Sequence, residues 1–206
     1  MPLSSWLSPV TLTGKHVRLE PLTTAHVEGL ASVARETELW KLWYTAVAQP
    51  EKMAAEVARR LDLQAKGSML PFAVIEPVSA DVVGMTTYMN VDAANRRVEI
   101  GSTWVSPRVH RSGLNTEAKR LLLGHAFEKL DCIAVELRTH FLNHQSRQAI
   151  ERLGAKLDGI LRAHQIVTAP DGTKMLRDTC VYSILASEWP TVRTHLDWQL
   201  AKPRAI

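Results

Sequence analysis

The middle of the chain changes twice from strand-like to helix-like patterning, and this succession limits the possible folds more than any other feature. The segment RRVEIGSTWVS (96–106) has the composition of a strand and ends at Pro107. Helical spacing of apolar residues follows from about 115 to 130, then a β-branched run at 132–140 and a second helical segment at 143–154. Strand–helix–strand units of this kind imply a mixed sheet that is largely covered by helices.

The flanking segments add strands and helices on both sides of this region. We expect a first strand at 16–22, a helix that Thr23 or Thr24 caps and that runs to about Glu36, and a helix from Pro50 to about Lys66. The remaining predicted elements are strands at 71–78 and 82–91, strands at 157–167 and 177–185 joined by a turn at Pro170-Asp171-Gly172, and a last helix capped by Ser187 with Pro190 in its first turn.

Length and composition favour one globular domain that spans residues 1–206. Cys132 and Cys180 lie in apolar runs, so we interpret both as core residues, and no Cys/His spacing suggests a metal. The sequence begins without the pattern of a secretory signal and contains no apolar run of about 20 residues, so a cytoplasmic protein without a membrane partner is expected. The net charge of +4 is modest, and the scattered basic residues do not predict direct nucleic-acid binding.

The segment TWVSPRVHRSGLNTEAKRLLLGHAF (103–127) carries the clearest functional pattern. A strand ends, a glycine-containing loop turns, and a helix begins with polar residues. The first N–H groups of such a helix have no partner within it and its positive dipole end points outward, so a pyrophosphate suits the place. Neither the GxGxxG pattern of a dinucleotide site nor a P-loop pattern is present.

The same segment resembles the GNAT acetyltransferases, in particular their RimJ/RimL-like branch, which acetylates N-terminal amines of ribosomal proteins. The phosphate loop of that family is Gln/Arg-x-x-Gly-x-Gly/Ala; here Gly113 matches, whereas His110 and Asn115 depart from the pattern. The resemblance covers about residues 14–190, in the expected order. The segments that carry it are VRLEPLT, VEIGSTWVSP, Thr-Glu-Ala at 116–118, FLNHQSRQAIERLGAKLDGILR and SILASEWP.

This resemblance implies a mixed α/β fold of the GNAT type: a mostly antiparallel sheet, flanked by helices, that splays open between the strands at 96–106 and 132–140. Acetyl-CoA would lie in that cleft, and a helix at about 188–200 would follow the core. A bulge in the first of these strands would present a backbone N–H to the thioester oxyanion. The residues implied for acetyl-CoA are Thr103, Trp104, Val105, His110, Arg111, Ser112, Gly113, Leu114, Asn115, Thr116 and Asn143.

Two residues are candidates for proton transfer. The resemblance implies that Ser146 protonates the leaving thiolate; Asn143, three residues earlier, would bind pantetheine or order the site. Alternatively, Asn143 only caps its helix and Ser146 has no special role. Glu99 is the candidate base for the amine, because a carboxylate in the middle of a covered strand needs a partner or a task. An ion pair with Arg97 or another basic residue is the alternative.

The expected reaction is acetyl transfer to an amine, by default a protein or peptide N-terminal α-amine. A small amine or antibiotic acceptor, or a coenzyme A sensor without activity, are the alternatives, and the chain could be a monomer or a homodimer. Trp40, Trp43 and Tyr44 are interpreted as aromatic core rather than as the wall of an acceptor pocket. No histidine has a partner spacing that predicts a role.

Overall fold

The computed structural model describes residues 6–169 and 171–202. In the N-terminal half, strands β1 (Leu12–Thr13) and β2 (Arg18–Pro21) precede helices α1 (Val27–Thr37) and α2 (Met53–Ala65). Next come the strands β3 (Met69–Ile75), β4 (Val82–Asp92) and β5 (Arg97–Val105), and helix α3 (Leu114–Glu128). The C-terminal elements are β6 (Ala134–His140), α4 (His144–Glu151), β7 (Lys156–Thr168), β8 (Lys174–Leu185) and α5 (Trp189–Ala201).

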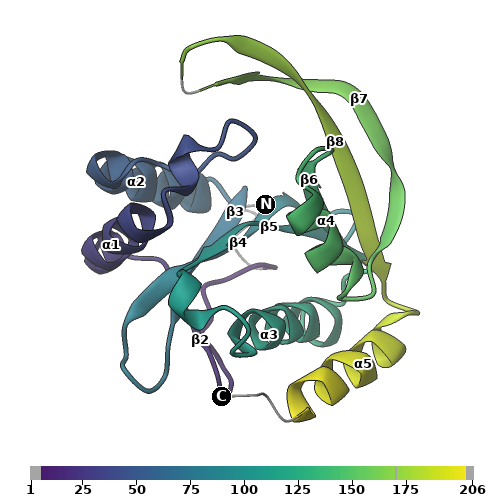
Figure 1. Ribbon diagram of the computed structural model, residues 1–206. Coiled ribbons are helices and arrows are strands. Elements are labelled where there is room, and N and C mark those ends of the chain that lie inside the picture. Colours follow the sequence, from purple (N-terminus) through teal and green to yellow (C-terminus); the bar gives the residue numbers. More distant parts are fainter. Residues whose placement is uncertain (1–5, 170, 203–206) are drawn as a thin grey trace.

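The strands form one sheet in the order β1-β2-β3-β4-β5-β6-β8-β7. The pair β5–β6 is parallel and the other neighbouring pairs are antiparallel, which confirms the predicted mixed, mostly antiparallel sheet. Helices α1 and α2 lie together on one side of the strands, and α3 and α5 lie on the other side (Figure 1).

Alternating side chains of the strands build a core on each side of the sheet. Val98 and Ile100 of β5, with Val135 of β6, pack with α3, α4 and α5 in the larger cluster. Met85 and Trp104 pack with α1 and α2 in the smaller one. Both cysteines are buried in the larger cluster, as predicted.

The sheet opens between β5 and β6. These strands pair only through Arg97–Glu99 and Ala134–Glu136, so the rest of each strand diverges from the other. The predicted splay is thereby confirmed. On its other side β5 carries a bulge: Met85 and Thr87 of β4 pair with Trp104 and Gly101, so two residues of β5 stand opposite one of β4.

The last two strands form a long hairpin that curves away from the rest of the sheet (Figure 1). Its edge strand β7 is mostly exposed and has an irregularity between Leu161 and Gln165. Asp178 of β8 binds the backbone N–H of Ala163 inside this irregularity, at 2.7 Å. The hairpin therefore bends, and it brings residues of both strands to the open side of the splay.

Three details differ from the prediction. Strand β1 was not predicted, because a strand of two residues leaves no readable alternation. The helix predicted after Thr23 begins as a 3-10 turn, in which Thr23 and His26 form the capping box, and becomes α-helical at Val27. Ser187 does not cap the last helix; Glu188 is its N-cap, although Pro190 does lie in its first turn. Residues 1–5 and 203–206 of the predicted domain and Pro170 of the predicted turn lie outside the described residues.

Candidate active site

A cleft of about 630 Å³ occupies the opening between β5 and β6. Its walls come from both of these strands, from the first turns of α3 and α4, from the loop between α1 and α2, and from the β7–β8 hairpin. The cleft therefore passes from one side of the sheet to the other.

The structure brings eight of the thirteen predicted site residues to the wall of this cleft. These are Glu99, Thr103, Trp104, Val105, His110, Asn115, Asn143 and Ser146. The other five, Arg111, Ser112, Gly113, Leu114 and Thr116, belong to the loop and first turn at the start of α3, next to the cleft. The side chain of Leu114 is buried in the core, so only its backbone is available to a ligand.

The start of α3 has the geometry of an anion site. Its N-cap is Gly113, whose φ of 93° lies in the left-handed region that glycine tolerates best. The N–H of Leu114 donates to Ser112 Oγ at 3.3 Å, and that of Glu117 to the Gly113 carbonyl at 2.9 Å. Within the described chain this leaves the N–H groups of Asn115 and Thr116 for a ligand.

Asn115, which departs from the family pattern, does not close the cleft. Its side chain lines the wall, and its Oδ1 atom is buried without a hydrogen-bond partner in the described residues. A buried carbonyl oxygen of this kind requires a donor. A ligand amide that lies in the cleft could supply it.

Asn143 caps α4, as one of the two sequence interpretations proposed. Its Oδ1 accepts the backbone N–H of Ser146 at 3.1 Å, which fixes the first turn of the helix. The Ser146 hydroxyl forms no hydrogen bond within the described structure and lies at the cleft wall. The cap and the free hydroxyl are compatible, so the structure supports a structural role for Asn143 and leaves the hydroxyl of Ser146 available.

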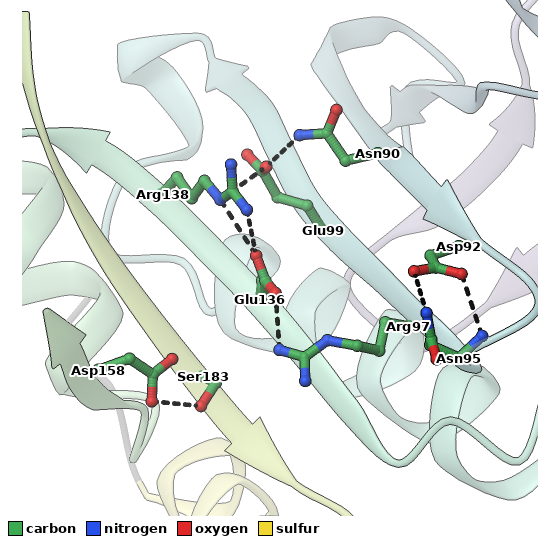
Figure 2. A network of polar contacts seen from close by, with 9 residues as sticks. All are labelled: Asn90, Asp92, Asn95, Arg97, Glu99, Glu136, Arg138, Asp158 and Ser183. Carbon is green, nitrogen blue, oxygen red and sulfur yellow. Dashed lines mark hydrogen bonds and ion pairs between the residues drawn. The ribbon is translucent and has the colours of Figure 1, made fainter. Parts of the chain in front are cut away.

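Glu99 is buried at the apex of the opening, where β5 and β6 separate. Asn90 Nδ2 donates to its Oε2 at 2.7 Å, and Arg138 Nε lies 3.4 Å from the same oxygen (Figure 2). Arg97, the partner suggested from the sequence, instead binds Glu136 at 2.6 Å. Burial raises the pKa of Glu99, while the bond from Asn90 and the charge of Arg138 oppose this shift. Glu99 is thus both ion-paired and at the cleft.

Lys119 is the first residue that sequence reasoning missed. It lies on α3, is 6% exposed, and reaches the cleft wall. Its Nζ donates to Thr103 Oγ1 at 2.5 Å and to Thr86 Oγ1 at 3.4 Å. Burial lowers its pKa to about 7. In the sequence, Lys119 is one of two lysines on the predicted helix, with Lys129, and its burial could not be inferred from spacing.

The hairpin side of the cleft carries further polar groups that were not predicted. His140, at the end of β6, is 4% exposed; its Nδ1 accepts the N–H of Leu142 at 3.0 Å, and its Nε2 has no partner in the described residues. Arg177 of β8 likewise lines the cleft with an unpartnered Nε. Burial lowers the pKa of both groups. The sequence around both residues predicts a strand and contains no pattern that indicates a functional role.

The aromatic residues before α2 are not core residues, contrary to the prediction. Trp40, Trp43 and Tyr44 are only half-buried, and Tyr44 lines the cleft. The ring of Trp43 meets that of His140 edge to face, with centroids 4.9 Å apart. Of the three rings only that of Tyr44 lines the cleft, whereas Trp40 and Trp43 line a separate, smaller pocket together with Thr168 of β7.

Residues 6–169 and 171–202 contain no group of three or more His, Cys, Asp or Glu side chains placed to hold a metal ion. In the same residues, no helix combines the length and apolar character that crossing a membrane requires.

Comparison with known proteins agrees with this geometry. Residues 16–156 match the family described as Acetyltransferase (GNAT) domain. A curated protein of Bacillus subtilis (strain 168), "Putative ribosomal N-acetyltransferase YdaF", is 34% identical over 106 residues, which are 52% of this chain and 55% of that protein. The chain thus spans about half the length of this curated relative.

Solved structures extend the likeness to nearly the whole chain. A GCN5-related N-acetyltransferase from Brucella melitensis is 33% identical, with a TM-score of 0.80 over 95% of this chain and 87% of its own. Mycobacterium smegmatis RimJ, solved in complex with CoA-disulfide, shares the fold at 21% identity, with a TM-score of 0.76 over 93% and 95% of the two chains. With its family match over residues 16–156 and its sheet splayed between β5 and β6, this chain belongs to the GNAT acetyltransferase family.

Proposed function

We propose that this protein transfers the acetyl group of acetyl-CoA to an amine, and that the acceptor is a protein or peptide N-terminal α-amine. The observation that carries the proposal is the cleft between β5 and β6, which joins the N-terminus of α3 to the polar hairpin side. The pyrophosphate would bind the free N–H groups at the start of α3. The pantetheine arm would then run along the separated strands toward Glu99.

The reaction needs one bond to form and one to break. The amine nitrogen attacks the thioester carbon, the C–S bond breaks, and the thiolate of coenzyme A leaves and takes up a proton. The amine loses a proton in the same exchange, so overall a proton moves from nitrogen to sulfur. In this proposal Ser146 donates to the thiolate and Glu99 accepts from the amine; both side chains line the cleft. Because positioning alone supplies up to about 7–11 kcal/mol, neither group needs to be a strong acid or base.

An α-amine is the acceptor that this site suits best. Its pKa is near 8, whereas that of a lysine side chain is near 10.4, so a weak base is enough to produce the neutral form. The name of the curated relative from Bacillus subtilis, a ribosomal N-acetyltransferase, supports a protein acceptor. The hairpin side of the cleft offers polar side chains of β7 and β8, such as His164 and Thr179, to a chain that follows the amine.

Incubation with acetyl-CoA and a panel of amines tests this function. The panel contains peptides with free N-termini, the same peptides with blocked N-termini and a free lysine, polyamines and aminoglycosides, and mass spectrometry identifies the products. Acetylation of free N-termini alone is the expected result. Acetylation of only small amines would contradict the protein acceptor, and tight CoA binding with no product would indicate a sensor.

Binding measurements test the phosphate site separately. Coenzyme A and acetyl-CoA are expected to bind far more tightly than pantetheine, which lacks the pyrophosphate. Equal affinity for pantetheine would exclude the start of α3 as the phosphate site.

A further inference from the structure

Lys119 is a buried lysine whose charged form, present below its lowered pKa of about 7, has no counter-charge in the described structure. Its side chain extends from α3 to the sheet, where it meets only hydroxyl oxygens, those of Thr103 and Thr86. Burial alone shifts its pKa, without any contribution from a neighbouring carboxylate. An isolated ammonium in such a position costs folding free energy.

The second buried cation at this sheet shows the usual solution. Arg60 of α2 is 4% exposed and forms an ion pair with Glu56 at 2.7 Å, in addition to a hydrogen bond to Thr87. Its charge is matched inside the fold, and it does not line the cleft. Lys119 differs on both points, so a role in fold stability does not account for it.

The hydrogen bonds around Lys119 leave one hydroxyl proton unused. Lys119 donates to both hydroxyls, and the oxygen atoms of Thr86 and Thr103 lie 2.7 Å apart, so one of them donates to the other. When Thr86 is the donor, Thr103 accepts two hydrogen bonds and keeps its own proton. Thr103 lines the cleft, and it lies in the bulge of β5.

We propose that Lys119 is a positioning residue that acts through Thr103. It orients and polarises the Thr103 hydroxyl, which donates a hydrogen bond to the thioester oxygen of the acyl-CoA as negative charge develops there. In its charged form Lys119 meets a negative charge only in this state, which is the requirement for stabilising a transition state rather than bound substrate. The proposal rests on the proposed acetyl transfer and adds a side-chain donor to it.

The test measures kcat at saturating acetyl-CoA for Thr103→Val, Lys119→Met and the double variant. In enzymes, the loss of one preorganised oxyanion donor lowers kcat by about 100- to 1000-fold. Because Lys119 acts through Thr103 and the backbone N–H is a second donor, we expect a smaller fall in kcat here, of about 10- to 100-fold. The double variant should be no slower than the slower single variant, because both changes remove the same hydrogen bond. Thr103→Ser keeps the hydroxyl and should retain most of the rate. Independent effects that multiply, or an unchanged kcat in either single variant, would overturn the proposal.

Stability and binding separate this role from a structural one. Lys119→Met should raise Tm while lowering kcat, because it removes an unmatched buried charge. The matched control, Arg60→Met, should not raise Tm, because the charge that it removes is already matched by Glu56 at 2.7 Å and the same side chain donates to Thr87. A lower Tm with unchanged kcat in Lys119→Met would mean that Lys119 only stabilises the fold.

The dissociation constant of coenzyme A should change less than about threefold in Lys119→Met, since the proposed hydrogen bond strengthens during the reaction. A large loss of affinity with normal kcat would assign the hydroxyl to the pantetheine arm and overturn the proposal. A wild-type protein that transfers no acetyl group contradicts the proposed function as well. An active wild-type protein with an equally active Lys119→Met variant contradicts the role of Lys119 alone.

Discussion

Asn143 Oδ1 accepts the backbone N–H of Ser146 at 3.1 Å, and this bond joins helix capping to the candidate chemistry of the cleft. The residues are three apart, so the cap fixes the first turn of α4 and thereby the place of the Ser146 hydroxyl. Sequence reasoning treated a capping Asn143 and a functional Ser146 as competing interpretations. The geometry allows both.

Removal of the cap should cost stability first. Asn143→Ala is expected to lower the free energy of unfolding by about 1 kcal/mol, the usual loss for a missing N-cap oxygen. Asn143→Asp, which keeps the acceptor oxygen, should stay close to the wild type. Urea titrations of the three proteins measure this difference. A loss of coenzyme A affinity in Asn143→Asp as well would show that the amide also contacts the ligand.

The Ser146 hydroxyl is expected to affect the reaction and not the fold. Ser146→Ala should lower kcat by about 10- to 1000-fold, a range around typical acid–base effects. Coenzyme A affinity and Tm should hardly change, because the hydroxyl has no hydrogen bond in the described residues and the cap uses the backbone N–H. Steady-state kinetics with the acceptor found by the amine panel provide the measurement. An intact kcat would mean that solvent or another group protonates the thiolate.

Gly113 should be required for the phosphate site. Gly113→Val places a branched side chain at a φ of 93° and at the start of α3, so coenzyme A should bind more weakly, by about tenfold or more. Backbone strain alone could lower stability, and Gly172 supplies the control: its φ is 88°, and an added Cβ there meets no atom within 4 Å. Gly172→Val should lose stability but keep its affinity for coenzyme A. Equal affinities in both folded variants would contradict the site.

The sequence predicted those features that depend on local pattern. The strands that flank α3, the glycine loop and the cap at Asn143 each follow from spacing and residue type over a few positions. The family resemblance added the splay, which no single segment encodes. The hairpin side of the cleft could not be predicted in this way, because it forms only when the hairpin bends and Arg177 and Tyr44 come to line the same cleft.

The same limit applies to single residues. For Glu99 the sequence left open an ion pair with Arg97 or with another basic residue, and its partner is Arg138 of the neighbouring strand, while Arg97 pairs with Glu136. Strand alternation predicts that Arg97 and Glu99 lie on the same face of the sheet, but it does not predict which side chain of a neighbouring strand each of them contacts. Lys119 was missed because helical spacing does not reveal how deeply a side chain is buried.

Glu99 provides the prediction that separates catalysis from folding most sharply. A base at this position predicts that the Glu99→Gln variant has a kcat/KM lower than that of the wild type by up to about 100-fold. The loss should be greatest at low pH, where neutral amine is scarce. A purely structural carboxylate would give nearly parallel pH–rate profiles instead. Measurement of kcat/KM between about pH 6 and 9 covers the range in which an α-amine with a pKa near 8 changes its charge.

The pH dependence of thermal unfolding provides an independent test of the environment of Glu99. The pKa of Glu99 in the folded protein is raised above its ordinary value of 4.5, so between these two values the folded state binds more protons than the unfolded state. The stability that Glu99 contributes is therefore complete below pH 4.5 and is lost as the pH rises through the raised value. Glu99→Gln carries no such proton, so its Tm relative to the wild type should be higher at pH 8 than at pH 4. If the difference in Tm between the variant and the wild type is the same at both pH values, burial does not raise the pKa of Glu99. If the variant has a lower Tm and an unchanged kcat/KM, the role of Glu99 is structural, in the ion pair with Arg138.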